Sequence, residues 1–170
     1  LLAIATTAFD ISGYELCMPL WVGGTVVIAD RETAQDPVLL KRCLEREKIS
    51  LLQATPATWR MLLGAGWTPN PGLRMTSGGE PLTADLAERL LGEGCELWNL
   101  YGPTETTICS SVDRVLLDGD NITIGRPIQN TTMYVLDEAL NRLADGQEGE
   151  LCIGGRGVAR GYHNRPELTA

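Results

Sequence analysis

The residues best suited to chemistry lie in two short polar segments, Gly78-Gly79-Glu80 and 101–107. The second segment combines the aromatic ring of Tyr101, a Gly-Pro turn, several hydroxyl side chains and the carboxylate of Glu105. An aromatic ring can stack on a base, hydroxyls and amides bind phosphate, and a carboxylate oxygen binds Mg²⁺. A plain polar loop in which Thr104 caps a helix explains the same residues more simply. The residue types alone leave both explanations open.

Both polar segments follow apolar runs that are typical of buried strands. The chain offers four strand candidates of this kind, over residues 25–29, 49–52, 73–76 and 95–100. Helical spacing of apolar residues and favourable first residues predict helices over 12–22 and 36–48, from Thr55-Pro56 onward, and from the N-cap Thr83 to 91. Strands that alternate with helices predict an α/β layer with a largely parallel sheet. Ligands bind such sheets beyond the carboxyl ends of the strands, where both polar segments lie.

The pattern changes after about residue 115, where helical periodicity is absent. Short strand candidates over residues 122–124, 132–136 and 150–153 are separated by turn sequences, Asp118-Gly119-Asp120, Asp145-Gly146 and Gly154-Gly155. We therefore expect a β-rich second region.

Composition and charge exclude several function classes. With 170 residues, of which 44% are hydrophobic and 21% charged, the chain is expected to form about one globular domain. Its 14 Lys and Arg against 22 Asp and Glu give a net charge of −8, which argues against a nucleic-acid-binding surface. No apolar run approaches the roughly 18–20 residues that span a membrane. The lone histidine, His163, and the absence of a Gly-x-Ser-x-Gly sequence argue against histidine-based metal centres and serine hydrolases.

Several reactive or aromatic residues have structural explanations. The five cysteines are scattered and form no CxxC pair, which predicts free thiols in a reducing cytoplasm. Cys109 has no cationic neighbour in sequence, so we expect it to pack rather than to react. We also expect packing roles for the tryptophans, Trp21, Trp59, Trp67 and Trp98. The chain begins at Leu1 without Met, and we expect it to be an internal part of a longer protein.

Three segments together resemble a known family. The sequence Asn99-Leu100-Tyr101-Gly102-Pro103-Thr104-Glu105 is similar to a signature of adenylate-forming enzymes, in particular the adenylation domains of nonribosomal peptide synthetases. The segment 149–162 resembles a second signature of that family, and Phe9-Asp10-Ile11-Ser12 resembles a third. The resemblance implies a partial AMP-binding domain over residues 1–170. In it, a layered, parallel-rich α/β sheet (1–115), part of the family's large N-terminal subdomain, precedes a β-rich, barrel-like segment (116–170).

The family activates a carboxylic acid with ATP, releases pyrophosphate, and transfers the acyl group to a phosphopantetheine thiol on a carrier domain. The resemblance implies that Tyr101 stacks on adenine, that Thr104 contacts the α-phosphate and that Glu105 binds Mg²⁺. Thr104 and Glu105 would then be the catalytic residues. The implied nucleotide-binding set is Gly79, Glu80, Asn99, Tyr101, Gly102 and Thr104, with the first two lining the adenine site through their backbone.

Asp10 is the residue that distinguishes an amino acid from a plain acyl substrate. In members that activate amino acids, an aspartate at this position pairs with the substrate's α-ammonium group. Without the other signatures, Asp10 is explained by its place at the start of the first predicted helix, where the helix dipole favours a negative charge. Together with the other signatures, Asp10 favours amine recognition, because a buried ammonium without a partner is prohibitively costly.

Eight further positions match the family's specificity-determining set, namely Ile11, Tyr14, Gln53, Thr76, Gly78, Leu100, Ile108 and Cys109. None is charged, so a charged substrate side chain would lack a partner. The large Tyr14 and Gln53 favour a small neutral amino acid. Five of the eight resemble glycine-type codes, whereas Tyr14, Thr76 and Cys109 depart from them.

The family's phosphate loop is expected before Leu1, and its ribose-binding aspartate and catalytic lysine after Ala170, so the isolated chain is expected to be inactive. The implied partners are peptidyl carrier and condensation domains of the same synthetase. Two alternatives stay open. An acyl- or aryl-CoA ligase has no use for Asp10, and a binding module without turnover has no need of intact Thr104 and Glu105.

Overall fold

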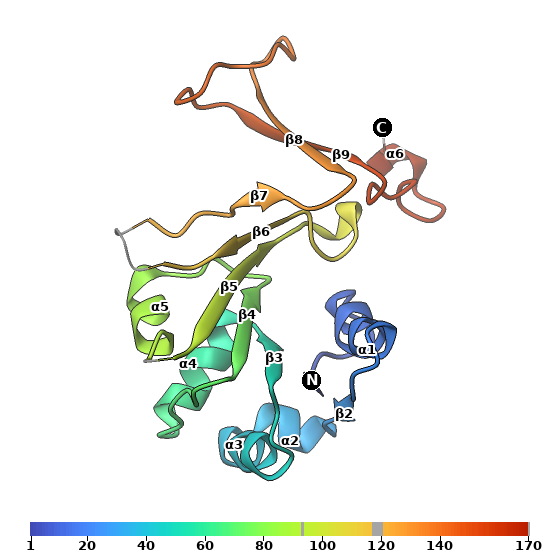
Figure 1. Ribbon diagram of the computed structural model, residues 1–170. Helices are drawn as coiled ribbons and strands as arrows, with labels where there is room; N and C mark the ends of the chain where they lie inside the picture. The colour runs from blue at the N-terminus through green and yellow to red at the C-terminus, as the bar shows by residue number, and fades with distance from the viewer. Residues whose placement is uncertain (93, 117–120, 170) are drawn as a thin grey trace.

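The computed structural model describes residues 1–92, 94–116 and 121–169, which form an α/β layer followed by an antiparallel hairpin (Figure 1). The layer is built on one sheet with the strand order β2-β1-β3-β4-β5-β6-β7. Strands β2 to β5 in this order are parallel, whereas β6 and β7 are antiparallel additions. The bounds are β1 (Leu2–Ala3), β2 (Val27–Ile28), β3 (Leu51–Ala54), β4 (Arg74–Gly78), β5 (Glu96–Tyr101), β6 (Ser111–Arg114) and β7 (Arg126–Pro127). The predicted α/β class with a parallel-rich sheet is confirmed.

The four predicted helices begin within one or two residues of the expected positions, and the structure adds two short helices and a 3-10 turn that were not predicted. They are α1 (Ile11–Trp21), α2 (Arg31–Gln35), α3 (Pro37–Arg46), α4 (Pro56–Gly64), α5 (Ala84–Leu90), the 3-10 turn η1 (Thr104–Thr106) and α6 (Pro166–Thr169). Asp36 and Thr55 cap α3 and α4 with their side chains, in front of a proline at the first helical position. Thr83 is the N-cap residue of α5 as predicted but makes no capping hydrogen bond, because its hydroxyl accepts one from Arg60 Nη2 at 2.7 Å.

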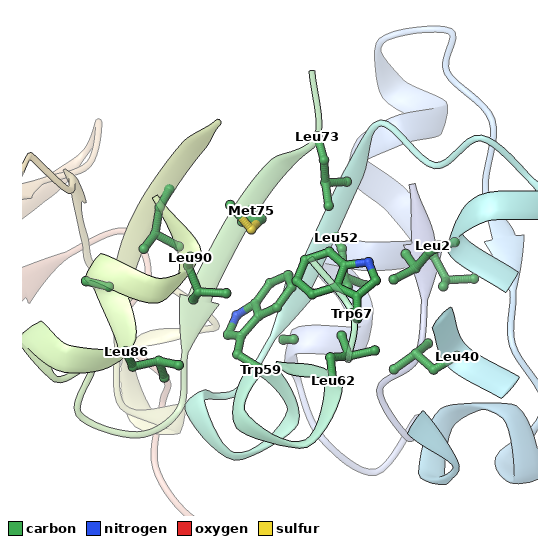
Figure 2. Packing of buried hydrophobic residues seen from close by; sticks show 14 of the residues in the cluster. Leu2, Leu40, Leu52, Trp59, Leu62, Trp67, Leu73, Met75, Leu86 and Leu90 are labelled. Atoms are coloured by element: carbon green, nitrogen blue, oxygen red, sulfur yellow. The ribbon is translucent and has the colours of Figure 1, made fainter. Parts of the chain in front are cut away.

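The hydrophobic core lies on one face of the sheet. Alternate strand residues Leu2, Leu52, Met75 and Leu97 are aligned across four strands and pack against α3, α4 and α5. Figure 2 shows Trp59 and Trp67 in this cluster, stacked with ring centroids 5.8 Å apart. The packing role predicted for Trp21 is wrong, since it is 89% exposed at the end of α1. The core thus anchors one face and leaves the opposite face of β3–β5 for α1 (Figure 1).

The second region contains a β-hairpin, as expected of a β-rich region, and the structure shows that its strands are antiparallel. Strands β8 (Thr131–Leu136) and β9 (Glu150–Gly155) pair over six residues each. Within the described residues they form an open hairpin rather than a closed barrel. The predicted strand over 122–124 is wrong, because this segment is instead tied to β5 by a hydrogen bond from Asn99 Nδ2 to the Thr123 carbonyl (2.8 Å). The turn predicted at residues 118–120 lies outside the described residues.

No helix in the described part of the chain has the length and apolar character needed to cross a membrane.

Glu15 is a buried residue of α1 whose carboxyl group binds the backbone just after β1. Its Oε2 accepts hydrogen bonds from the amides of Ile4 (3.0 Å) and Ala5 (2.8 Å). Its Oε1 has no hydrogen-bond partner among the described residues. Burial raises the pKa of Glu15, although the two backbone hydrogen bonds oppose this shift.

The raised pKa predicts how Glu15 affects stability as the pH changes. Between the ordinary glutamate pKa and the raised folded value, the folded chain keeps a proton that the unfolded chain releases, so stability falls as the pH rises. Glu15→Gln removes this dependence while preserving an oxygen that accepts both amides. We measure the urea midpoints of wild type and Glu15→Gln between pH 4 and pH 8. The wild-type midpoint minus the Glu15→Gln midpoint should decrease as the pH rises. The exposed control Glu88→Gln should follow wild type, and parallel wild-type and Glu15→Gln curves would contradict the prediction.

Candidate functional site

A cavity of about 320 Å³ opens at the carboxyl ends of β4 and β5. This volume suits a small-molecule ligand. The cavity is lined by Gly79, Glu80, Pro81, Asn99, Leu100, Tyr101, Gly102, Pro103 and Ile124. These include every residue of the expected nucleotide-binding set except Thr104. Sequence reasoning missed Pro81, Pro103 and Ile124. Pro81 directly follows the first predicted polar segment and Pro103 lies within the second, whereas nothing local in the sequence places Ile124 there.

Two glycines shape the cavity because a side chain would not fit the backbone there. Gly79 has a φ of +85°, a left-handed conformation that residues with a Cβ rarely adopt. At Gly102 an added Cβ would lie 2.7 Å from Cys109 Cα and 2.8 Å from Ser110 N. The end of β5 can therefore press against the segment that follows η1, and the Ser110 amide donates to the Tyr101 carbonyl at 2.7 Å.

Thr104 does not cap the η1 turn. Pro103, not Thr104, is the N-cap residue of η1, and no side chain caps this turn. The helix-cap explanation of Thr104 is therefore wrong. Thr104 is exposed, and its hydroxyl makes no hydrogen bond within the described residues.

Glu105 is exposed one residue further along η1. Its Oε1 accepts a hydrogen bond from the Tyr162 hydroxyl, and this bond holds the pKa of Glu105 below its usual range. No cluster of three or more His, Cys, Asp or Glu side chains is found in residues 1–92, 94–116 and 121–169. Mg²⁺ needs no such cluster, because one or two carboxylates hold it together with water and phosphate oxygens. An ionised carboxylate two residues after Pro103 of the cavity wall fits that ion.

Asp10 joins α1 to the segment after η1. It lies at the N-cap position of α1 but makes no capping hydrogen bond. Instead, its Oδ2 accepts a hydrogen bond from the Ile108 amide, 98 residues away, at 3.0 Å. Thr107 and Ile108 have φ values of 64° and 65°, so this hydrogen bond supports a strained backbone. Oδ1 makes no hydrogen bond within the described residues and is available to a ligand.

The expected specificity residues meet on the sheet face beneath α1. Gln53 and Thr76 are paired neighbours on β3 and β4, and the Thr76 hydroxyl donates to Gln53 Oε1 at 2.5 Å. Burial raises the pKa of the Tyr14 phenol on α1, an effect that a hydrogen bond with Thr76 opposes. Gly78 and Leu100 are paired on the same face, and an added Cβ on Gly78 would lie 3.0 Å from the Leu100 carbonyl oxygen.

The remaining specificity residues border this face. Ile11 is buried at the first turn of α1, and the Ile108 side chain lies 3.3 Å from where a Cβ on Gly13 would be. Burial raises the pKa of the Cys109 thiol, which donates to the Ser111 carbonyl at 3.1 Å. The structure adds Trp98, a half-buried residue paired with Thr76 on this face. The alternation of side chains along β5, counted back from Leu100, would have found it.

The end of β5 connects the two halves of the site. Successive residues of a strand point to opposite faces, so the side chains of Leu100 and Tyr101 lie on different sides of the sheet. Leu100 is paired with Gly78 on the face of the expected specificity residues, and it also lines the cavity together with Tyr101. One strand end thus places residues of the expected amino-acid site next to the cavity.

A family profile described as AMP-binding enzyme matches residues 1–163. The chain belongs to this family. It is 45% identical over 171 residues to a dimodular nonribosomal peptide synthase of Bacillus subtilis (strain 168), a match that covers 100% of this chain. The chain spans only 7% of that relative's length.

Solved structures of similar proteins agree with this AMP-binding assignment. One is a four-domain nonribosomal peptide synthetase in its holo form, bound to AMP and glycine, with 52% identity and a TM-score of 0.93. The match covers 99% of this chain and 13% of that one. Another is an NRPS protein that contains adenylation and PCP domains, with 28% identity, a TM-score of 0.88, and coverage of 99% and 30%. The resemblance inferred from the three sequence motifs is confirmed.

Proposed function

We propose that this AMP-binding chain is part of an adenylation domain that activates a small neutral amino acid with ATP in nonribosomal peptide synthesis. The observation that carries the proposal is the pairing of two sites at the end of β5. The Asp10 carboxylate, with one free oxygen, lies on one side, and the cavity lined by Tyr101 lies on the other. The AMP and glycine bound by the structure that is 52% identical support the same pair of ligands.

The proposed reaction joins the two ligands directly. A carboxylate oxygen of the amino acid attacks the α-phosphorus of ATP, a new P–O bond forms, and pyrophosphate leaves with the electrons of the bond that breaks. Asp10 holds the ammonium group, so the carboxylate is turned toward the nucleotide. The exposed Thr104 hydroxyl donates to the α-phosphate. Glu105 would hold Mg²⁺, and the ion would supply positive charge to the phosphates when bound.

The aminoacyl-adenylate then serves as the donor for a thioester. The thiol of a phosphopantetheine arm attacks its carbonyl carbon, and AMP leaves. The similar NRPS protein with adenylation and PCP domains supports a carrier domain as the partner. We propose a condensation domain as a further partner and a cytoplasmic location, for which the five free cysteines are suited. Residues 1–115 form the α/β part and residues 116–170 the β-rich part of the proposed domain.

The pocket beneath α1 favours glycine as the amino acid. Gln53 and Thr76 form a hydrogen bond with each other, so they do not require a polar side chain on the substrate as a partner. The ring of Tyr14 reaches Thr76 and occupies space that a longer side chain needs. Thr76 and Tyr14 differ from glycine-type codes in sequence, yet a hydrogen bond joins them, which supports a shared role in limiting the size of the substrate.

Pyrophosphate exchange by the complete adenylation domain tests this proposal. We expect exchange to be fastest with glycine, slower with alanine, and absent with leucine or with fatty and aryl acids, whereas acetate, which lacks only the amino group of glycine, should support slow exchange. Omitting the amino acid gives the background rate. Exchange driven by fatty or aryl acids would identify an acyl- or aryl-CoA ligase instead, and no exchange with any acid would leave a binding module.

A further inference from the structure

The segment after β9 packs against the loop that carries Glu105. We call residues 157–162 the supporting segment. The Thr107 hydroxyl donates to the Gly157 carbonyl at 2.7 Å, and the Ala159 amide donates to the Glu105 carbonyl at 2.7 Å. Figure 1 shows the yellow η1 turn beside the red C-terminal part of the chain. Two segments about 50 residues apart in sequence are therefore joined by one backbone hydrogen bond and one from a side chain.

This approach is close enough to require a glycine. A Cβ on Gly157 would lie 2.6 Å from the Thr106 carbonyl oxygen, so any side chain there would force the two segments apart. The contacts at Gly157 and Ala159 fix the distance between the supporting segment and η1. They bring the next aromatic side chain, Tyr162, to the Glu105 carboxylate.

Tyr162 makes the one side-chain hydrogen bond to this carboxylate within the described residues, through Oε1. Oε2 makes none there. An exposed glutamate without such a tether samples many rotamers, and ordering it on binding a ligand costs free energy. A tether on one oxygen removes part of that cost and fixes the direction of the other oxygen.

We propose that Tyr162 is a positioning residue for Glu105, whose free oxygen it directs toward the metal ion that accompanies the nucleotide phosphates. The proposal rests on the proposed function. It assigns a role to the tyrosine of the 149–162 segment, which the nucleotide and substrate sets leave unused. Groups that orient a metal-binding carboxylate in this way contribute 10–100-fold to metal affinity.

The test measures how much a metal ion improves nucleotide binding, without turnover. The dissociation constant of α,β-methylene-ATP is determined by calorimetry once without and once with Mn²⁺. The value without Mn²⁺ divided by the value with Mn²⁺ is the metal enhancement. In the complete adenylation domain, we expect Tyr162→Phe to reduce this enhancement by about tenfold, the lower end of the range, because Glu105 is exposed. Tyr134→Phe, which changes an exposed tyrosine on the hairpin, should keep the wild-type enhancement.

Glu105→Gln separates the possible outcomes. If it abolishes the enhancement and Tyr162→Phe reduces it, the proposal is supported. An enhancement that falls only in Glu105→Gln overturns the role of Tyr162 and leaves the proposed function intact. If both variants keep it, the metal role of Glu105 fails together with that of Tyr162, while pyrophosphate exchange still decides the reaction. Equal losses with and without Mn²⁺ in Tyr162→Phe would indicate general structural damage and also overturn the proposal.

Discussion

Asp10→Ala should weaken amino-acid activation in the complete adenylation domain by about 3–5 kcal/mol, the scale of leaving one member of a buried ion pair without its partner. The substrate's ammonium group would be desolvated at the end of α1 with no anion to receive it. The loss should appear chiefly as a higher KM for the amino acid in pyrophosphate exchange, since Asp10 contacts the group that does not react.

Asp10→Asn separates the charge of Asp10 from its structural role. An asparagine oxygen can still accept the hydrogen bond that the Ile108 amide gives to Asp10 Oδ2. If the purpose of Asp10 is to hold the strained Thr107–Ile108 backbone, Asn should restore most of the activity. We expect instead that Asp10→Asn is nearly as impaired as Asp10→Ala but melts at the wild-type temperature.

A substrate without an amino group provides the second control. Acetate, which is glycine without its amine, gains nothing from Asp10, so Asp10→Ala should leave its slow exchange unchanged. Near-wild-type exchange of glycine in Asp10→Ala would remove the amino-acid assignment. A parallel loss for acetate and glycine would show that Asp10 acts on the fold of the pocket alone.

Local sequence patterns were sufficient for the α/β half of the fold. Apolar runs of four to six residues place β3, β4 and β5 within a few residues, and N-cap residue types at Thr55, before Pro56, and at Thr83 place the helices that follow β3 and β4. The two polar segments after β4 and β5 then lie at the carboxyl edge of the sheet by topology alone. That is why the cavity walls could be predicted from the sequence.

Contacts between distant segments had no local signal. The short strands β6 and β7 have no alternating apolar pattern, because they extend an edge of the sheet and face solvent on part of their surface. The hydrogen bond from Ile108 to Asp10 spans 98 residues, and the one from Tyr162 to Glu105 spans 57. The segment containing Ile124 has strand-like residues but is tied by Asn99 rather than by a ladder of backbone hydrogen bonds. Such contacts depend on how the helices and strands pack in three dimensions, which short sequence patterns do not encode.

Glu105→Gln should reduce the rate of pyrophosphate exchange at a fixed Mg²⁺ concentration by about 10²–10³, the usual effect of removing one group that stabilises charge in a transition state. The substitution keeps the size of the side chain and an oxygen for Tyr162, but it removes the negative charge that attracts a divalent cation. The metal requirement should therefore rise, so that part of the activity returns at high Mg²⁺. The KM for the amino acid should stay near wild type, because the proposal assigns amino-acid binding to Asp10 and the residues beneath α1 rather than to Glu105.

The Mg²⁺ dependence of exchange, measured at saturating amino acid, decides whether Glu105 has this role. Glu105→Asp retains the charge on a shorter side chain, so it should need less Mg²⁺ than Glu105→Gln and more than wild type. Glu138→Gln removes a carboxylate from an exposed position on the hairpin and should follow the wild-type curve. An unchanged curve for Glu105→Gln would leave Glu105 with no role beyond the η1 turn. Because Thr104 is exposed and caps nothing, it would then be the one residue of this turn with a polar group free to meet the phosphates.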